Sequence, residues 1–125
     1  MVGLVVISHS AKVAEGTVDL MKMMATDIHA AAAGGSDENE LGTSFDKIVS
    51  AIETVNDGDG VLLLCDMGSS VMTADMIIET MGYKDVKVAD CPLIEGSIVA
   101  AMAAVSGTAL NDIQVSWENS VLHKN

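Results

Sequence analysis

Short continuous apolar runs alternate along the chain with longer segments of helical periodicity. The runs at Val2–Ser8 and Val61–Asp66 are typical of strands that are buried on both faces, as parallel strands covered by helices are. Asp27–Ala33 is a weaker third strand, because alanine is a poor strand former. Val86–Asp90 is predicted to be a fourth, partly exposed strand.

The segments between these strands repeat apolar residues three or four positions apart, which is the spacing of one helix face. The stripes consist of Ala14, Val18, Met21 and Ala25; Phe45, Ile48, Val49, Ile52 and Val55; Val71, Ala74, Ile78 and Met81; then, after Pro92, Ile98, Met102 and Val105, and last Leu110, Ile113 and Trp117. This alternation predicts an α/β fold, with an open, mainly parallel sheet of about four strands and helices on both faces. The polar stretch 34–43 is predicted to be a long loop, and residues 1–125 a single domain.

The composition narrows the possible partners. Half of the 125 residues are hydrophobic, which is enough for a full core. Eighteen acidic residues against six basic ones give a net charge of −12. Nucleic acids and anionic membranes recruit basic surfaces, so this charge argues against both. It suits docking onto a basic protein, although solubility alone explains it equally well.

The remaining composition favours a cytoplasmic location. No segment approaches the roughly twenty apolar residues of a membrane helix, and the apolar start has no basic leader. Cys65 and Cys91 do not follow a metal-binding spacing such as C-x-x-C, so reduced thiols are expected. We expect no metal and no organic cofactor.

A histidine and an aspartate follow two of the predicted strands. His9 comes directly after the first strand, and Asp66 ends the third. Ligands of open α/β sheets lie beyond the carboxyl ends of the strands, so the two residues share that edge if the strands are neighbours. Phosphoryl transfer through histidine needs one nucleophilic ring nitrogen, with the other held protonated by an acceptor. The Asp66 carboxylate is a candidate for that acceptor.

A phosphoryl group also needs hydrogen-bond donors, which the N-termini of helices supply. "CDMGSS" ends where the third helix is predicted to start, and "LGTSFD" offers a second helix start, with Thr43 as N-cap and Asp46 at the capping-box position. The expected phosphate-binding residues are Ser10, Thr43, Gly68, Ser69 and Ser70. Each candidate also has an ordinary interpretation, as a structural histidine or a helix cap, and only their convergence on one edge favours catalysis.

Four motifs, in this order, resemble a known family: "VISHSAKVAEG", "LGTS", "DMGSS" and "CPLIEG". They are similar to the phosphotransferase subunits of phosphoenolpyruvate-dependent dihydroxyacetone kinase, the DhaM family. More distantly the chain resembles the mannose-type enzyme IIA of sugar phosphotransferase systems. The resemblance runs from residue 1 to about residue 110. Mannose-type members usually carry a proline in the loop after the aspartate, and its absence from "MGSSV" favours the kinase branch.

The resemblance implies a parallel α/β fold with the strand order 2-1-3-4, which pairs as a homodimer. It also implies a phosphohistidine at His9, with Asp66 beside it. It implies that the phosphocarrier protein HPr donates the phosphoryl group as a separate protein. The acceptor would be ADP bound to the nucleotide subunit of dihydroxyacetone kinase, so that the chain is a phosphotransferase subunit supporting dihydroxyacetone phosphorylation. It also suggests that the segment Pro92–Gly96 borders the site.

Other functions stay open on the sequence. The more distant resemblance to mannose-type enzyme IIA leaves open an alternative function, as a component of a sugar phosphotransferase transporter. A receiver domain needs acidic residues after the first strand, and a flavodoxin needs aromatic residues to stack on its flavin, whereas "ISHS" is not acidic and the chain has three aromatics. A cysteine hydrolase would use Cys65 with His9 and Asp66. His29, inside the second predicted strand, and His123, in the tail, are expected to be structural or solvated, and Cys65 a buried thiol.

Overall fold

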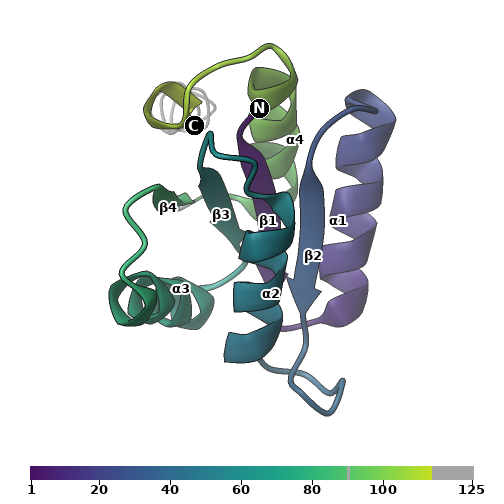
Figure 1. The fold of residues 1–125 in the computed structure, drawn as a ribbon. Coiled ribbons are helices and arrows are strands. Elements are labelled where there is room, and N and C mark those ends of the chain that lie inside the picture. The colour runs from purple at the N-terminus through teal and green to yellow at the C-terminus, as the bar shows by residue number, and fades with distance from the viewer. Residues whose placement is uncertain (90, 114–125) are drawn as a thin grey trace.

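A parallel sheet of four strands forms the centre of the computed structural model, which describes residues 1–89 and 91–113 (Figure 1). The strands lie in the order β2-β1-β3-β4, as the sequence predicts. Along the chain the elements are β1 (Gly3–Ser8), α1 (Ala11–Met24), β2 (Ala30–Gly34), α2 (Phe45–Val55), β3 (Val61–Cys65), α3 (Gly68–Met81), β4 (Val86–Ala89) and α4 (Leu93–Val105).

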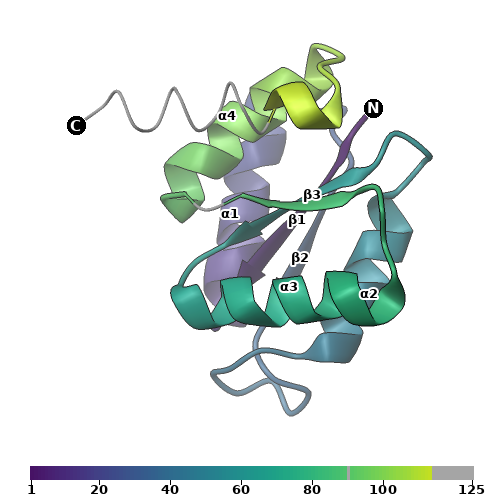
Figure 2. The same cartoon turned by 90° about the vertical axis from the view of Figure 1, so that its left-hand side faces the viewer.

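Two hydrophobic cores lie on opposite faces of this sheet. Alternate residues of β1 and β3 point to opposite faces, so one set packs against α1 and α4 and the other against α2 and α3. Figure 2 shows the sheet between these two helical layers. The central strands β1 and β3 are therefore buried on both faces, which explains why they form unbroken apolar runs.

The second strand lies further along the chain than predicted, at Ala30–Gly34 instead of 27–33. The chain still turns after α1, where the N–H of Ile28 donates to the carbonyl of Ala25 (3.3 Å), and pairing with β1 starts only at Ala30. Gly34 ends the strand against the start of α1. A Cβ there would lie 2.7 Å from the carbonyl oxygen of Ser10, so the close approach requires glycine.

His29 therefore lies just before β2, and its predicted position inside the strand is wrong. Its side chain is about half exposed, and Nδ1 lies 3.4 Å from Oδ2 of Asp57. The exposed His29–Asp57 pair can therefore serve as a control for the His9–Asp66 pair at the other end of the sheet.

The predicted cap of α2 is also wrong. Ser44 is the N-cap, not Thr43, and Oγ of Ser44 accepts the N–H of Lys47 (3.1 Å). The helix starts at Phe45 because that side chain packs partly buried against the core. Lys47, and not Asp46, therefore occupies the capping-box position, and Asp46 lies in the first turn, where its charge favours the helix dipole.

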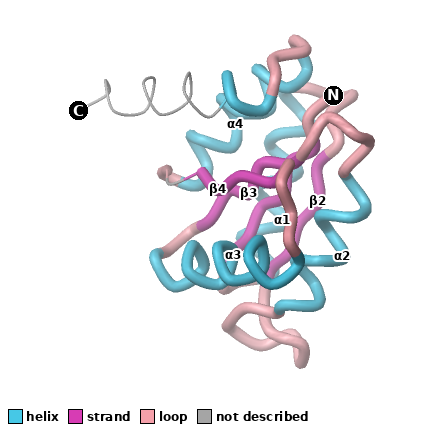
Figure 3. Tube along the Cα trace, turned by 60° about the vertical axis from the view of Figure 1, so that its left-hand side comes forward, coloured by secondary structure: helices cyan, strands magenta, loops and turns pink. Residues whose placement is uncertain are grey.

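Several other predictions can be compared with the described residues. The loop before α2 spans 35–44 instead of 34–43, because Gly34 belongs to β2 and the helix starts at Phe45; Figure 3 shows this loop extending from one end of the molecule. Cys65 is buried, as expected. Pro92 is the N-cap of α4, and residues 93–96 form the first turn of that helix. Asp90, at the end of the predicted fourth strand, and Trp117 and His123 lie outside the described residues.

No helix among residues 1–89 and 91–113 is long and apolar enough to cross a membrane. The same residues contain no group of three His, Cys, Asp or Glu side chains that could hold a metal ion.

Candidate active site

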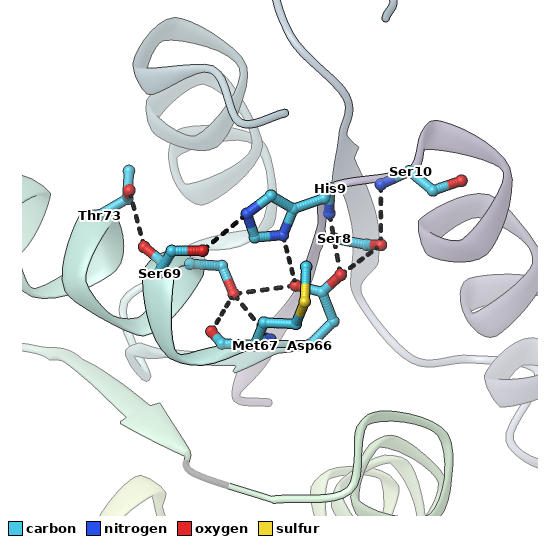
Figure 4. A network of polar contacts seen from close by, with 8 residues as sticks. Ser8, His9, Ser10, Asp66, Met67, Ser69 and Thr73 are labelled. Atoms are coloured by element: carbon cyan, nitrogen blue, oxygen red, sulfur yellow. Dashed lines mark hydrogen bonds and ion pairs between the residues drawn. The ribbon is translucent and has the colours of Figure 1, made fainter. Parts of the chain in front are cut away.

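The carboxyl ends of β1 and β3 bring His9 and Asp66 together. Ile7 pairs with Cys65 in the sheet, and the N–H of Asp66 donates to the carbonyl of Ile7 (3.1 Å). His9 is the first residue after β1, and Asp66 is the first residue after β3. Their side chains therefore lie next to each other at this edge of the sheet. Figure 4 shows the resulting network of polar side chains around the imidazole of His9.

The Asp66 carboxylate holds His9 at two points. Nδ1 of the imidazole lies 3.0 Å from Oδ1, and the backbone N–H of His9 donates to Oδ2 (3.0 Å). A carboxylate only accepts hydrogen bonds, so Nδ1 carries the proton of the neutral ring and Nε2 keeps its lone pair. The geometry therefore presents Nε2 as the nucleophilic nitrogen.

Two serines complete the hydrogen bonding of this carboxylate. Ser8 donates to Oδ2 (2.9 Å), and Ser70 donates to Oδ1 (3.0 Å), with its hydrogen shared with the carbonyl of Met67 (2.7 Å). Burial raises the pKa of Asp66, but the hydrogen bonds from His9, Ser8 and Ser70 outweigh burial, and the pKa lies below its ordinary 3.8. Asp66 therefore stays ionised at neutral pH and can balance positive charge on the ring.

Nε2 of His9 faces the start of α3. Oγ of Ser69 lies 2.8 Å from Nε2 and is placed to donate to its lone pair, while Thr73 donates to the carbonyl of Ser69 (3.0 Å), as Figure 4 shows. The side chain of His9 is 22% exposed, so the nitrogen can be reached from solvent. An incoming group at Nε2 would displace the Ser69 hydroxyl, which could then donate to that group.

The N-termini of two helices flank the imidazole. His9 is followed by Ser10, the N-cap of α1, and α3 begins at Gly68, next to Ser69. Within the described residues, the N–H groups of Gly68 and Ser69 have no hydrogen-bond partner. Free N–H groups and the positive ends of two helix dipoles make this position favourable for an anion.

The expected phosphate-binding residues have different surroundings. Gly68 and Ser69 are exposed beside Nε2, whereas Ser70 is fully buried and supports Asp66. Oγ of Ser10 accepts the N–H of Val13 (3.3 Å) as the cap of α1. The backbone next to Thr43 lies near His9, because Gly42 donates its N–H to the carbonyl of His9 (2.8 Å).

Ser8 belongs to the site but was not predicted from the sequence. This residue is 1% exposed, and its hydroxyl donates to Asp66 and accepts the N–H of Ser10 (3.0 Å), linking the carboxylate to the start of α1. The only signal in the sequence was a hydroxyl at the end of an apolar run, in "ISHS".

Ser8→Ala is expected to raise the pKa of Asp66. The carboxylate loses one of its hydrogen-bond donors, and each such donor favours the ionised form of the group. A carboxyl whose pKa is lowered by folding stabilises the folded state at pH values above the ordinary pKa of 3.8. This stabilisation is lost as the pH falls through the folded-state pKa. The variant should therefore lose stability mainly above pH 4. Carbon-13 NMR titration of the carboxyl and melting curves against pH measure both effects.

Thr17→Val is the matched control for this prediction. Thr17 is also buried, and its hydroxyl donates to the carbonyl of Val13 on α1. It should leave the titration of Asp66 unchanged. An unchanged titration in folded Ser8→Ala protein as well would contradict the role given to Ser8.

Comparisons with known proteins agree with this geometry. The family model of the mannose-type enzyme IIA (EIIA-man), described as "PTS system fructose IIA component", matches residues 3–114. The phosphotransferase subunit DhaM of the PTS-dependent dihydroxyacetone kinase of Lactococcus lactis is 35% identical over 122 residues, covering 98% of each chain. The chain belongs to the DhaM family.

Other DhaM proteins match over different shares of their length. The phosphoryl donor subunit DhaM of a Listeria innocua kinase is 37% identical over 99 residues, which cover 79% of this chain and 78% of the relative. The Escherichia coli DhaM is 35% identical over 90% of this chain, which spans only 25% of that longer protein. Membership of this family gives the chain a role in phosphoryl transfer.

A solved structure supports the fold of this DhaM family member. A crystal structure of a protein of unknown function superposes with a TM-score of 0.83 at 23% identity, covering 95% of both chains. At that identity the likeness shows the fold alone.

Proposed function

We propose that this chain is the phosphoryl carrier of a phosphoenolpyruvate-dependent dihydroxyacetone kinase, with the phosphoryl group on Nε2 of His9. One observation carries the proposal: Asp66 binds Nδ1 at 3.0 Å, which leaves Nε2 as the nucleophile between two helix N-termini. The similar DhaM proteins, among them the phosphoryl donor subunit of a Listeria innocua kinase, support the same conclusion.

In the first step the lone pair of Nε2 attacks the phosphorus of phospho-HPr. The bond between Nε2 and phosphorus forms as the bond to the donor breaks, and the donor nitrogen keeps the electron pair. Positive charge then develops on the imidazole of His9, and the ionised Asp66 stabilises it through the proton on Nδ1. The Ser69 hydroxyl swings away from Nε2 and donates to a phosphoryl oxygen.

In the second step the phosphoryl group passes to ADP bound on the nucleotide subunit of the kinase. A terminal oxygen of ADP attacks the phosphorus, the bond to Nε2 breaks, and ATP is regenerated for phosphorylation of dihydroxyacetone. Two anionic groups meet here, so N–H groups at Gly68 and Ser69 and the hydroxyl of Thr43 reduce the repulsion. Lys12, exposed on the first turn of α1, adds a cation near the site.

The chain works in the cytoplasm as a homodimer, without a metal or organic cofactor. An apolar fraction of 50% on a short chain supports pairing, and the chemistry above needs only side chains and the backbone. The net charge of −12 argues against nucleic acid and membrane partners. A monomer mass in light scattering at micromolar concentration would contradict the dimer.

The alternative function is the enzyme IIA component of a sugar transporter. It too would accept the phosphoryl group from HPr on His9, but would pass it to a histidine or cysteine of another protein. The absence of proline from residues 67–71 favours the kinase subunit.

The phosphoryl acceptor distinguishes the two functions. Phosphorylated protein is expected to lose its phosphoryl group on mixing with the ADP-loaded nucleotide subunit of dihydroxyacetone kinase. Dihydroxyacetone phosphate should then form when the substrate-binding subunit is added. If the phosphoryl group stays on His9 in this mixture but moves readily to a mannose-type enzyme IIB, the transporter function is correct.

A further inference from the structure

Helix α3 carries a row of exposed methionines that starts beside the imidazole. Ser69 contacts Nε2 of His9, and Met72 and Met76 lie three and seven positions further along, so they continue the same face of the helix. Their exposed fractions are 73% and 53%. Thr73 and Thr80 complete this face, and the exposed Asp75 and Glu79 border it, each three positions from one of the two methionines.

A second exposed apolar group lies on the other side of His9. The loop 35–44 reaches the site through Gly42, whose N–H donates to the carbonyl of His9 (2.8 Å), and the preceding residue, Leu41, is 82% exposed. In Figures 2 and 3 this loop and α3 lie at the same end of the molecule. The acidic residues Glu38 and Glu40 are exposed around Leu41.

Among residues 1–89 and 91–113, no lysine or arginine forms an ion pair with Glu38 or Glu40. The cation that reaches the loop, Lys47, donates to the amide oxygen of Asn39 (2.9 Å) and the carbonyl of Gly34 (3.2 Å). An apolar patch bordered by unpaired carboxylates is complementary to an apolar patch bordered by lysine or arginine.

We propose that Met72, Met76 and Leu41 form the docking surface for the protein that donates the phosphoryl group. This inference rests on the proposed function. Nε2 can react only if the donor's phosphoryl group comes into contact with it. When a protein brings that group to Nε2, the protein also covers the side chains next to Nε2. Methionine suits this task because its flexible side chain adapts to a partner's shape.

A second copy of this chain fits the surface poorly. It would bring its own acidic residues, from a chain of net charge −12, toward Glu38 and Glu40, and like charges across an interface are unfavourable. The occupant is therefore a different protein, with a phosphoryl group set in an apolar patch and basic residues around it.

The test compares two double variants in which the substituted methionines have nearly equal exposed fractions. Met72→Gln with Met76→Gln alters the surface, whereas Met23→Gln with Met24→Gln alters residues of 71% and 51% exposure at the far end of α1. Each protein is phosphorylated with phospho-HPr, and separately with phosphoramidate, a small donor that needs no docking. The α3 variant should show KM for phospho-HPr raised about tenfold or more, since interface anchors typically carry such effects.

The same variant should react with phosphoramidate at the parent rate, and the α1 variant should match the parent with both donors. An unchanged KM for phospho-HPr in the α3 variant would overturn the docking surface. So would a loss of the dimer in light scattering without a change of KM, because the surface would then bind a second copy. If the parent itself takes up no phosphoryl group from either donor, the proposed function fails instead.

Discussion

His9→Ala protein is expected to take up no phosphoryl group from phosphoenolpyruvate, enzyme I and HPr, whereas the parent should take up one per chain. The imidazole of His9 is held by Asp66 through Nδ1 and offers Nε2 to solvent between two helix N-termini. Alanine removes the nucleophile and leaves the rest of the site in place. Intact mass measurement after the incubation counts the phosphoryl groups directly.

His29→Ala is the control for this experiment. His29 also faces an aspartate, with Nδ1 3.4 Å from Asp57, but the pair is exposed and lies before β2, away from the carboxyl ends of the strands. This variant should take up one phosphoryl group, as the parent does. Uptake that persists in His9→Ala protein would remove His9 from the mechanism.

Asp66→Asn should slow phosphoryl uptake by a factor of about 10²–10³, the usual cost of losing one electrostatic contact in a transition state. The asparagine has nearly the same shape but no negative charge to balance the imidazolium that develops on His9. Its NH₂ group would also face donors, because Ser8, Ser70 and His9 all donate to the carboxylate. Single-turnover kinetics with phospho-HPr measures the rate.

Asp57→Asn provides the matched control, since it removes the partner of the exposed His29. Its uptake rate should equal that of the parent, and melting curves should show that Asp66→Asn protein is folded. A folded Asp66→Asn protein with parent kinetics would reduce Asp66 to a structural residue.

The pattern of apolar residues was sufficient for most of the fold. Strands buried on both faces must be apolar throughout, so β1 and β3 could be located almost to the residue. β2 could not, because its alanines fit a helix or a strand equally well. Its position depends instead on pairing with β1 and on the close approach of Gly34 to Ser10, which are tertiary contacts.

The sequence predicted that His9 and Asp66 form the site, but it did not predict the separate roles of the serines around them. His9 and Asp66 follow β1 and β3, and the family resemblance implied that these two strands are neighbours. The roles of Ser69 and Ser70 depend on where α3 begins, because consecutive helical residues point about 100° apart. Ser8 reaches Asp66 across 58 positions of sequence only in the observed register, so no local pattern could reveal it.

The proposed mechanism requires that Nε2 of His9 carries the phosphoryl group while Asp66 holds the proton on Nδ1. Its most direct test is proton–nitrogen correlation NMR of protein labelled with nitrogen-15 in histidine, recorded before and after phosphorylation. We predict that the signals of His9 change to those of an Nε2-phosphorylated imidazole with a protonated Nδ1. A phosphoryl group on Nδ1 of His9, or on another residue, would contradict the account.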